Sequence, residues 1–196
     1  MSTITFPSTP KPESMSWKLV QPAQNNISGW SGARQVLASN RGWWECEVVL
    51  PPIVGTSNFN AWRSFTAQMR GMVNDAQIPV DPTAQSAIAN TMSVNGSGQT
   101  GRSINVDGLP NSTTVLTAGQ FVTINYQLLQ LTANVTSNGS GQATLTFEPP
   151  IRSAPSDNAV VEFKNPYCLM YLVQEPTYSV TKGYVYSLSL SLRECF

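Results

Sequence analysis

The side chains best suited to chemistry lie close together in one short segment. Trp43 and Trp44 are followed by Glu45 and Glu47. Together with Trp62, the tryptophans could stack on a sugar, and the two carboxylates could serve a glycosidase. Glycosidase carboxylates must flank the scissile bond from opposing walls, so two on one strand face are better explained as protection of a sheet edge. Tandem tryptophans on a strand point to opposite faces, which favours a core or interface role for these rings.

Other motifs point away from a cofactor or metal site. Residues 96–101 match the G-x-G-x-x-G pattern, but a dinucleotide turn must open a helix, and residues 103–106 predict a strand. We therefore interpret residues 96–101 as a turn. The aspartates are isolated and form no calcium loop. We expect no catalytic residue, no cofactor and no metal ligand.

The composition excludes further classes of function. The chain has 196 residues, with 11 basic and 11 acidic side chains and no histidine. Without histidine there is no Ser-His-Asp or Cys-His nucleophile and no imidazole ligand. Scattered, balanced charges leave no basic stripe for nucleic acid. Cys46, Cys168 and Cys195 form no C-x-x-C pair, which disfavours a zinc site, and their odd number disfavours a secreted disulfide scaffold.

The N-terminal segment predicts an extended arm. Residues 1–16 are rich in proline and polar side chains and lack the apolar core of a signal peptide. We expect order to begin near Trp17, with the arm lying on a neighbouring surface or awaiting a partner. No run of about 18 apolar residues occurs, so we expect no membrane insertion and a soluble protein made in a cytoplasm.

The first half of the chain predicts a few strands and one helix. Short strands are expected at residues 17–20 and 34–37, separated by a turn-rich stretch. Residues 43–50 alternate between an apolar and a mixed face, which is typical of a half-buried strand. Residues 57–70 predict a helix with Ser57 as its cap and Gly71 at its end. The apolar residues of that helix recur at steps of three and four: Phe59, Trp62, Phe65 and Met69.

The second half predicts a compact β-module. Residues 93–166 contain short alternating segments separated by Gly, Asn and Pro. Residues 167–173 and 184–192 predict further strands, the last with alternating apolar side chains that need a pairing partner. We therefore expect a mainly β (α+β) chain with a discontinuous domain at residues 17–92 and 167–196. Residues 93–166 are the expected inserted β-barrel.

Several segments in this order resemble the distal tail proteins, or tail adaptors, of long-tailed bacteriophages. The segments that carry the resemblance are residues 43–48 (Trp-Trp-Glu-Cys-Glu-Val) with 50–52 (Leu-Pro-Pro), the helix end at residues 65–71, and residues 105–112 (Asn-Val-Asp-Gly-Leu-Pro-Asn-Ser), 116–121 (Leu-Thr-Ala-Gly-Gln-Phe), 131–135, 140–144 and 147–152 (Phe-Glu-Pro-Pro-Ile-Arg).

The resemblance implies a structural virion protein. In that family a β-sandwich-like belt domain, built from both ends of the chain, forms a sixfold ring that joins the tail tube to the hub or fibre protein. An inserted barrel, compared to the oligonucleotide- or oligosaccharide-binding (OB) fold, projects outward, and DNA passes without sequence-specific contact. The implied location is the distal end of the virion tail, assembled in the host cytoplasm.

From the residues we expect an assembling subunit rather than an enzyme. Strand edges, the arm and surplus aromatic side chains would form the contacts between copies. The candidate interface residues are Trp43, Trp44, Glu45, Glu47, Trp62, Tyr184 and Tyr186. Two alternatives stay open: a tail-tube or tail-terminator subunit, and a carbohydrate-binding β-module whose partner would be a host-surface glycan.

Overall fold

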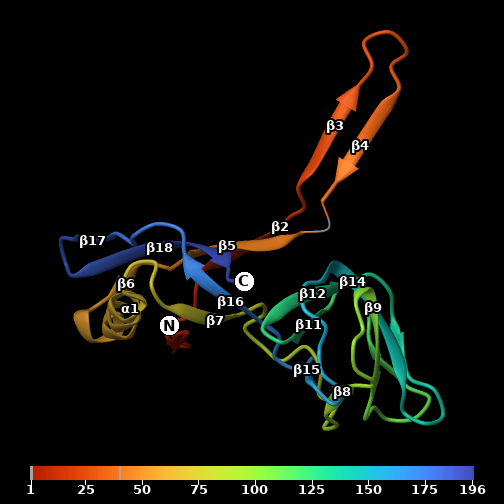
Figure 1. Cartoon of the computed structure of the whole chain (residues 1–196). Coiled ribbons are helices and arrows are strands. Elements are labelled where there is room, and N and C mark those ends of the chain that lie inside the picture. The colour runs from red at the N-terminus through yellow and green to blue at the C-terminus, as the bar shows by residue number, and fades with distance from the viewer. Residues whose placement is uncertain (1, 40) are drawn as a thin grey trace.

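The structure, a computed structural model, describes residues 2–39 and 41–196, so Met1 of the expected arm lies outside it. Within these residues the chain is 46% strand and 7% helical, with one helix and a closed barrel of six antiparallel strands. The prediction of a mainly β chain with one helix and a barrel is thereby confirmed. Figure 1 shows three parts: a sheet with its helix, the barrel beside it, and a long hairpin that projects from the body.

The sheet joins strands from both ends of the chain. Its order is β1-β7-β16-β18-β5-β2, and β6 and β17 also pair with β18. The strands are β1 (Thr3–Thr5), β2 (Ser14–Val20), β5 (Trp43–Val49), β6 (Ile53–Val54), β7 (Asp75–Pro79), β16 (Tyr167–Leu172), β17 (Tyr178–Thr181) and β18 (Val185–Glu194). β18 therefore finds the partner that its alternating apolar side chains require, because it pairs antiparallel with β5 and β16.

The alternation of β5 determines which side chains enter the core. Trp44, Cys46 and Val48 are buried, whereas Glu47 and Val49 on the other face are exposed. Successive side chains of a strand point to opposite faces, so the apolar face packs inward and the acidic face remains at the surface. The predicted half-buried strand is confirmed here.

The helix α1 (Thr56–Met69) covers the core of the sheet. Phe59, Trp62, Phe65 and Met69 are its buried residues, as the spacing predicted. The predicted cap at Ser57 is wrong, because the helix begins one residue earlier, after Gly55, and that end has no side-chain cap. Gly55 has a φ of 89°, a left-handed conformation that glycine adopts without strain.

The N-terminal residues belong to the core of the chain itself. β1 pairs in parallel with β7, and the ring of Phe6 meets Trp62 edge-on with 5.1 Å between centroids. The Trp62 indole N–H donates to the carbonyl of Pro10 at 3.1 Å. The expectation that order begins near Trp17 is therefore wrong. The arm packs against the helix because the apolar ring of Phe6 lies on the apolar stripe of that helix.

The barrel closes on itself through antiparallel pairs alone. Its order is β11-β12-β14-β9-β8-β15, and β15 pairs back to β11. The strands are β8 (Met92–Val94), β9 (Gly101–Asp107), β11 (Phe121–Ile124), β12 (Gln127–Leu131), β14 (Ala143–Ile151) and β15 (Val160–Glu162), and β10 (Thr114–Leu116) pairs separately with β13 (Val135–Thr136). Residues 96–101 form a turn that leads into β9, as predicted, and the Gln99 side chain bridges that turn to the main chain of Asn105.

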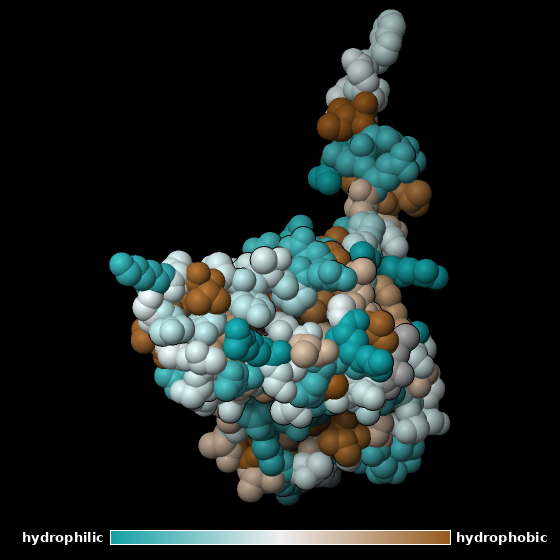
Figure 2. Space-filling model, turned by 90° about the vertical axis from the view of Figure 1, so that its left-hand side faces the viewer, coloured by the Kyte–Doolittle hydropathy of each residue, from teal (hydrophilic) through white to brown (hydrophobic). Residues whose placement is uncertain are grey.

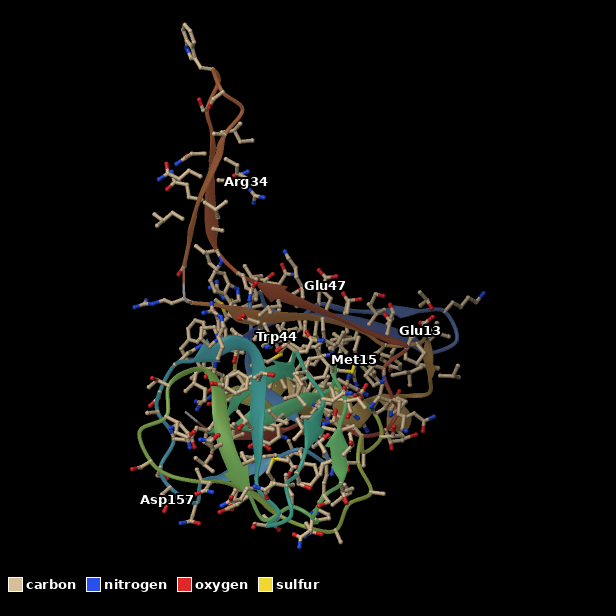
Figure 3. The ribbon with its side chains drawn as sticks, turned by 90° about the vertical axis from the view of Figure 1, so that its right-hand side faces the viewer. Glu13, Met15, Arg34, Trp44, Glu47 and Asp157 are labelled. Carbon is tan, nitrogen blue, oxygen red and sulfur yellow. The ribbon has the colours of Figure 1, made fainter. Side chains whose placement is uncertain are left out.

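An ion pair with a buried carboxylate joins the barrel to the sheet. Arg152, directly after β14, donates two hydrogen bonds to the carboxylate of Glu194 in β18, at 2.9 and 2.5 Å. Glu194 is fully buried and also accepts the main-chain N–H of Trp44. The Trp44 indole N–H donates to the carbonyl of Leu128 in the barrel. Figure 3 shows Trp44 between the two parts, so the contact is both apolar and charge-assisted.

Candidate assembly surface

The projecting hairpin is the most exposed part of the described chain. β3 (Ala23–Ile27) pairs antiparallel with β4 (Arg34–Ala38), and every residue of both strands is exposed. Figure 1 shows the hairpin standing clear of the body, and Figure 3 shows Arg34 partway along it. An isolated two-stranded hairpin is at best marginally stable in water. This ribbon therefore lacks the packing that normally supports a strand pair.

Apolar side chains extend along the hairpin to its tip. Ile27 is 66% exposed, Leu37 is 70% exposed, and Trp30 in the connecting loop is fully exposed. Figure 2 shows hydrophobic residues alternating with hydrophilic ones along the projection. The loop has a defined shape, because Ser28 and Ala33 are hydrogen-bonded through their main chains and Gly32 adopts a φ of 67°. The tip thus presents a fully exposed aromatic side chain on a loop of defined main-chain shape.

A cavity of about 590 Å³ lies close to the base of the hairpin. The Arg193 guanidinium lies 4.3 Å from the centre of the Trp43 ring, and the Arg152 guanidinium lies 4.2 Å from the centre of the Phe196 ring. The Nε of Arg193 is buried and has no hydrogen-bond partner within the described residues. Arginine and tryptophan are enriched among the residues that dominate binding between proteins. The cavity therefore adds a second contact region to the hairpin.

The sheet has an open edge at β2. In the described sheet β2 pairs with β5 over its full length and ends the strand order on that side. The buried indole N–H of Trp17 has no partner within residues 2–39 and 41–196. An edge strand presents main-chain N–H and C=O groups that another strand can bind. The edge, the hairpin and the cavity are defined here as the assembly surface.

Three of the predicted interface residues lie inside the chain. Trp44 and Tyr186 are each 3% exposed, and Trp62 is fully buried. The Tyr186 hydroxyl is 2.9 Å from Thr56 Oγ1, and its ring stacks on Phe59 at 4.7 Å. Their aromatic surface is thus used by the core of the subunit and is not available to a partner that approaches from outside.

The other four predicted residues reach the surface but do not form one cluster. Trp43 is half-buried and donates its indole N–H to Glu45 at 3.1 Å. Glu45 also lies 3.6 Å from Lys18, and Glu47 is exposed on the same strand face. Tyr184 is 69% exposed and directly precedes β18. Glu45 is paired with Arg193, near the other end of that strand. Trp43 lines the cavity near the hairpin, whereas Tyr184 is distant from it along the sheet.

The sequence did not single out Trp30, the most exposed residue of the hairpin. Residues 25–32 are rich in Asn, Ser and Gly and predict a turn, yet residues 23–27 form a strand. The available signal was a tryptophan among turn-forming residues, followed by adjacent apolar side chains at Val36 and Leu37. Both faces of the ribbon are exposed, so no alternation marks it as a strand.

Burial raises the pKa of all three thiols. Burial, with a smaller contribution from Glu47, raises the pKa of Cys46 to about 12. Burial also raises the pKa of Cys168 and, less strongly, that of Cys195. Only the thiolate is a good nucleophile or metal ligand. In the described chain no group of three or more His, Cys, Asp or Glu side chains is placed to hold a metal ion.

A scan against protein-family models matches no family, and a search of curated proteins finds no similar protein. Among residues 2–39 and 41–196, no helix is both long and apolar enough to span a bilayer.

Proposed function

We propose that this chain is a structural subunit of a bacteriophage tail. In this proposal six copies form a ring at the distal end of the tail, and the ring joins the tail tube to the hub or fibre assembly. The sheet with α1 serves as a sandwich-like ring domain, and the barrel serves as an outward, OB-like module. The protein acts by assembly in the virion and not by catalysis.

The hairpin β3–β4 is the observation that carries the proposal. Its strands are exposed throughout, and the loop that connects them carries the fully exposed Trp30. A ribbon that has no core of its own gains stability when a second surface covers its apolar side chains. The contact joins two different surfaces, a projection on one copy and a body on the next, so it is heterologous and closes into a ring when the rotation fits.

The open edge of β2 supports the same conclusion. A fully paired strand with one free edge accepts a strand from a neighbour through main-chain hydrogen bonds. A tail-tube or terminator subunit would use the same elements, and is distinguished by which tail proteins the ring binds.

The decisive experiment measures the native mass of the purified chain by light scattering, followed by negative-stain imaging. We expect a species near six times 21.3 kDa with an open centre. Trp30→Ser with Leu37→Ser should yield monomers that are still folded, because both side chains are exposed in the single chain. The matched control is Val160→Ser with Val173→Ser, which removes exposed apolar side chains elsewhere and should leave the ring intact. A wild-type chain that stays monomeric alone and with a phage tail-tube protein would contradict the proposal.

A further inference from the structure

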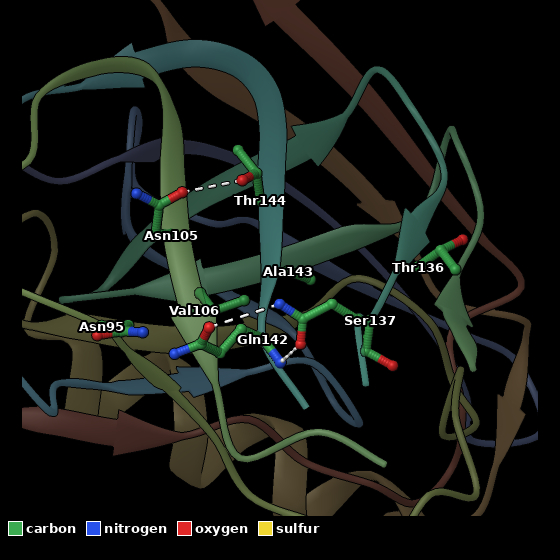
Figure 4. A pocket seen from close by; sticks show the side chains of 9 residues that line it. Asn95, Asn105, Val106, Thr136, Ser137, Gln142, Ala143 and Thr144 are labelled. Atoms are coloured by element: carbon green, nitrogen blue, oxygen red, sulfur yellow. Dashed lines mark hydrogen bonds between the residues drawn. The ribbon is translucent and has the colours of Figure 1, made fainter. Parts of the chain in front are cut away.

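A polar cavity of about 550 Å³ opens on the outer side of the barrel. It lies between the paired strands β9 and β14 on one side and residues 136–138 on the other. Figure 4 shows the amides of Asn95, Asn105 and Gln142 around this hollow, together with the hydroxyls of Thr144 and Ser137. Val106 also lines the cavity, but its side chain is fully buried in the barrel core. The cavity is far from the hairpin in the chain and uses none of its residues.

The lining carries amides and hydroxyls but no charge. None of the described residues that form the cavity is Asp, Glu, Lys or Arg. A charged ligand would lose its hydration there without gaining an ion pair. Uncharged amides, in contrast, both donate and accept hydrogen bonds. The cavity therefore fits a neutral ligand that carries many hydrogen-bonding groups.

Several donors in the cavity are free to bind. The side-chain amide of Asn95 makes no hydrogen bond to another described residue, and the NH₂ group of Gln142 makes none either. Asn105 accepts the Thr144 hydroxyl at 2.8 Å through its oxygen, which leaves its NH₂ group available. These three amides come from different segments of the barrel, so their donors converge on the cavity from separate directions.

The lining is also held in place before any ligand arrives. The main-chain N–H of Asn105 donates to the Gln99 side chain at 2.7 Å. The Asn138 side-chain oxygen accepts the main-chain N–H groups of Ser140 and Gln142 at 2.9 and 3.0 Å. Fixed polar groups lose little conformational entropy on binding, which favours recognition through hydrogen bonds.

We propose that this cavity binds a neutral oligosaccharide. Sugar hydroxyls can satisfy amide donors and acceptors at the same time, and every ring of an oligosaccharide carries such hydroxyls. A neutral peptide carries fewer such groups for each residue and would need apolar pockets for its side chains. The site belongs to the barrel alone, so it stands or fails independently of ring formation.

The test uses saturation-transfer NMR on the full chain with two neutral probes, maltotriose and chitotriose. A tri-galacturonate and a Gly-Ser peptide of similar size serve as comparison ligands. We expect at least one neutral trisaccharide to bind, and Asn95→Ala with Gln142→Ala to weaken that binding about tenfold through two lost hydrogen bonds. Neither side chain supports the fold strongly, since among the described residues Asn95 makes no side-chain hydrogen bond and Gln142 makes one long contact of 3.5 Å.

Asn165→Ala is the matched control, because Asn165 is exposed and lies in the connection between β15 and β16. It should bind as the wild-type chain does. The proposal is overturned if neither neutral trisaccharide binds, or if the double variant binds as tightly as the control. Stronger binding of the acidic sugar or of the peptide would also overturn it. None of these outcomes depends on whether the chain forms rings.

Discussion

The barrel and the sheet differ in whether their strands leave an open edge. The barrel closes through β15 and β11, so each of its strands has two neighbours, and its core holds Phe147 and Phe163. The sheet ends in the open edge of β2 and continues into a hairpin with no core. Closure removes the exposed edges of a sheet, whereas an open edge remains available to a partner. The barrel is thus complete within one chain, whereas the sheet keeps an edge that another strand can bind.

The largest expected effect lies in the core of the open part. Trp62→Ala should lower the free energy of unfolding by about 3–5 kcal/mol, because it leaves a cavity between the helix and the sheet. It also leaves the carbonyl of Pro10 without its donor. The same substitution at the exposed Trp30 should change stability by less than about 0.5 kcal/mol. Urea unfolding of both variants measures the difference, and equal losses would show that the hairpin is supported within the single chain.

A second prediction concerns the contact between the two parts. Arg152→Met should cost about 3–4 kcal/mol, because the Glu194 carboxylate would stay buried without its partner. Adding Glu194→Gln should recover much of that loss, since the buried charge is then gone. Thermal unfolding followed by both tryptophan fluorescence and circular dichroism should show one transition in the wild-type chain. Two transitions in the wild-type chain would mean that barrel and sheet unfold separately.

The barrel offers a sharper test at a single turn. Gly141 has a φ of 73°, and an added Cβ would lie 2.4 Å from the carbonyl oxygen of Leu109. Gly141→Ala should therefore cost about 2–3 kcal/mol through strain and steric contact. Gly139 in the same turn has open space around it and no positive φ, so Gly139→Ala should be nearly neutral. Chemical denaturation compares the two variants, and equal stability would contradict the turn geometry.

The smallest expected effect is a dependence on alkaline pH that arises in the sheet. Burial raises the pKa of Cys46 to about 12 in the folded chain, from 9.0. A raised folded pKa means that this thiol stabilises the fold fully below pH 9 and less as the pH rises towards 12. From pH 8 to 10 the loss is about 1.4 kcal/mol. Cys46→Ala should remove this loss, so the free energy of unfolding should fall less between pH 8 and 10 than in the wild-type chain. An equal fall in both chains would refute the assignment.

The parts that the sequence predicted well are those whose burial follows a local period. Spacing alone predicts the buried face of strand β5. It also predicts the buried stripe of the helix, which consists of Phe59, Trp62, Phe65 and Met69. The seven predicted interface residues were predicted less well, because three of them are buried. Their types suit both a core and a contact. The spacing places Trp44, Trp62 and Tyr186 on apolar faces, and the three-dimensional packing shows that these faces are covered within the chain itself.

What could not be predicted depends on contacts between distant parts of the chain. The pairing of Thr3 with Asp75 places a proline-rich segment in the sheet, although its composition is that of a mobile arm. The hairpin lacks alternation because no face of it is buried, so its strands were partly read as a turn. The polar cavity is formed by Asn95, Asn105 and Gln142, which the pairing of β9 with β8 and with β14 brings together.

One hydrogen bond has a consequence for how such a chain can change over time. The main-chain N–H of Val80 donates to the carbonyl of Pro166 at 3.0 Å, so the chain leaves the sheet and returns to it at neighbouring points. A segment that begins and ends side by side can be lengthened, shortened or replaced while the strands around it keep their register. The surface of the barrel can therefore change in evolution while the sheet that carries the barrel keeps its structure.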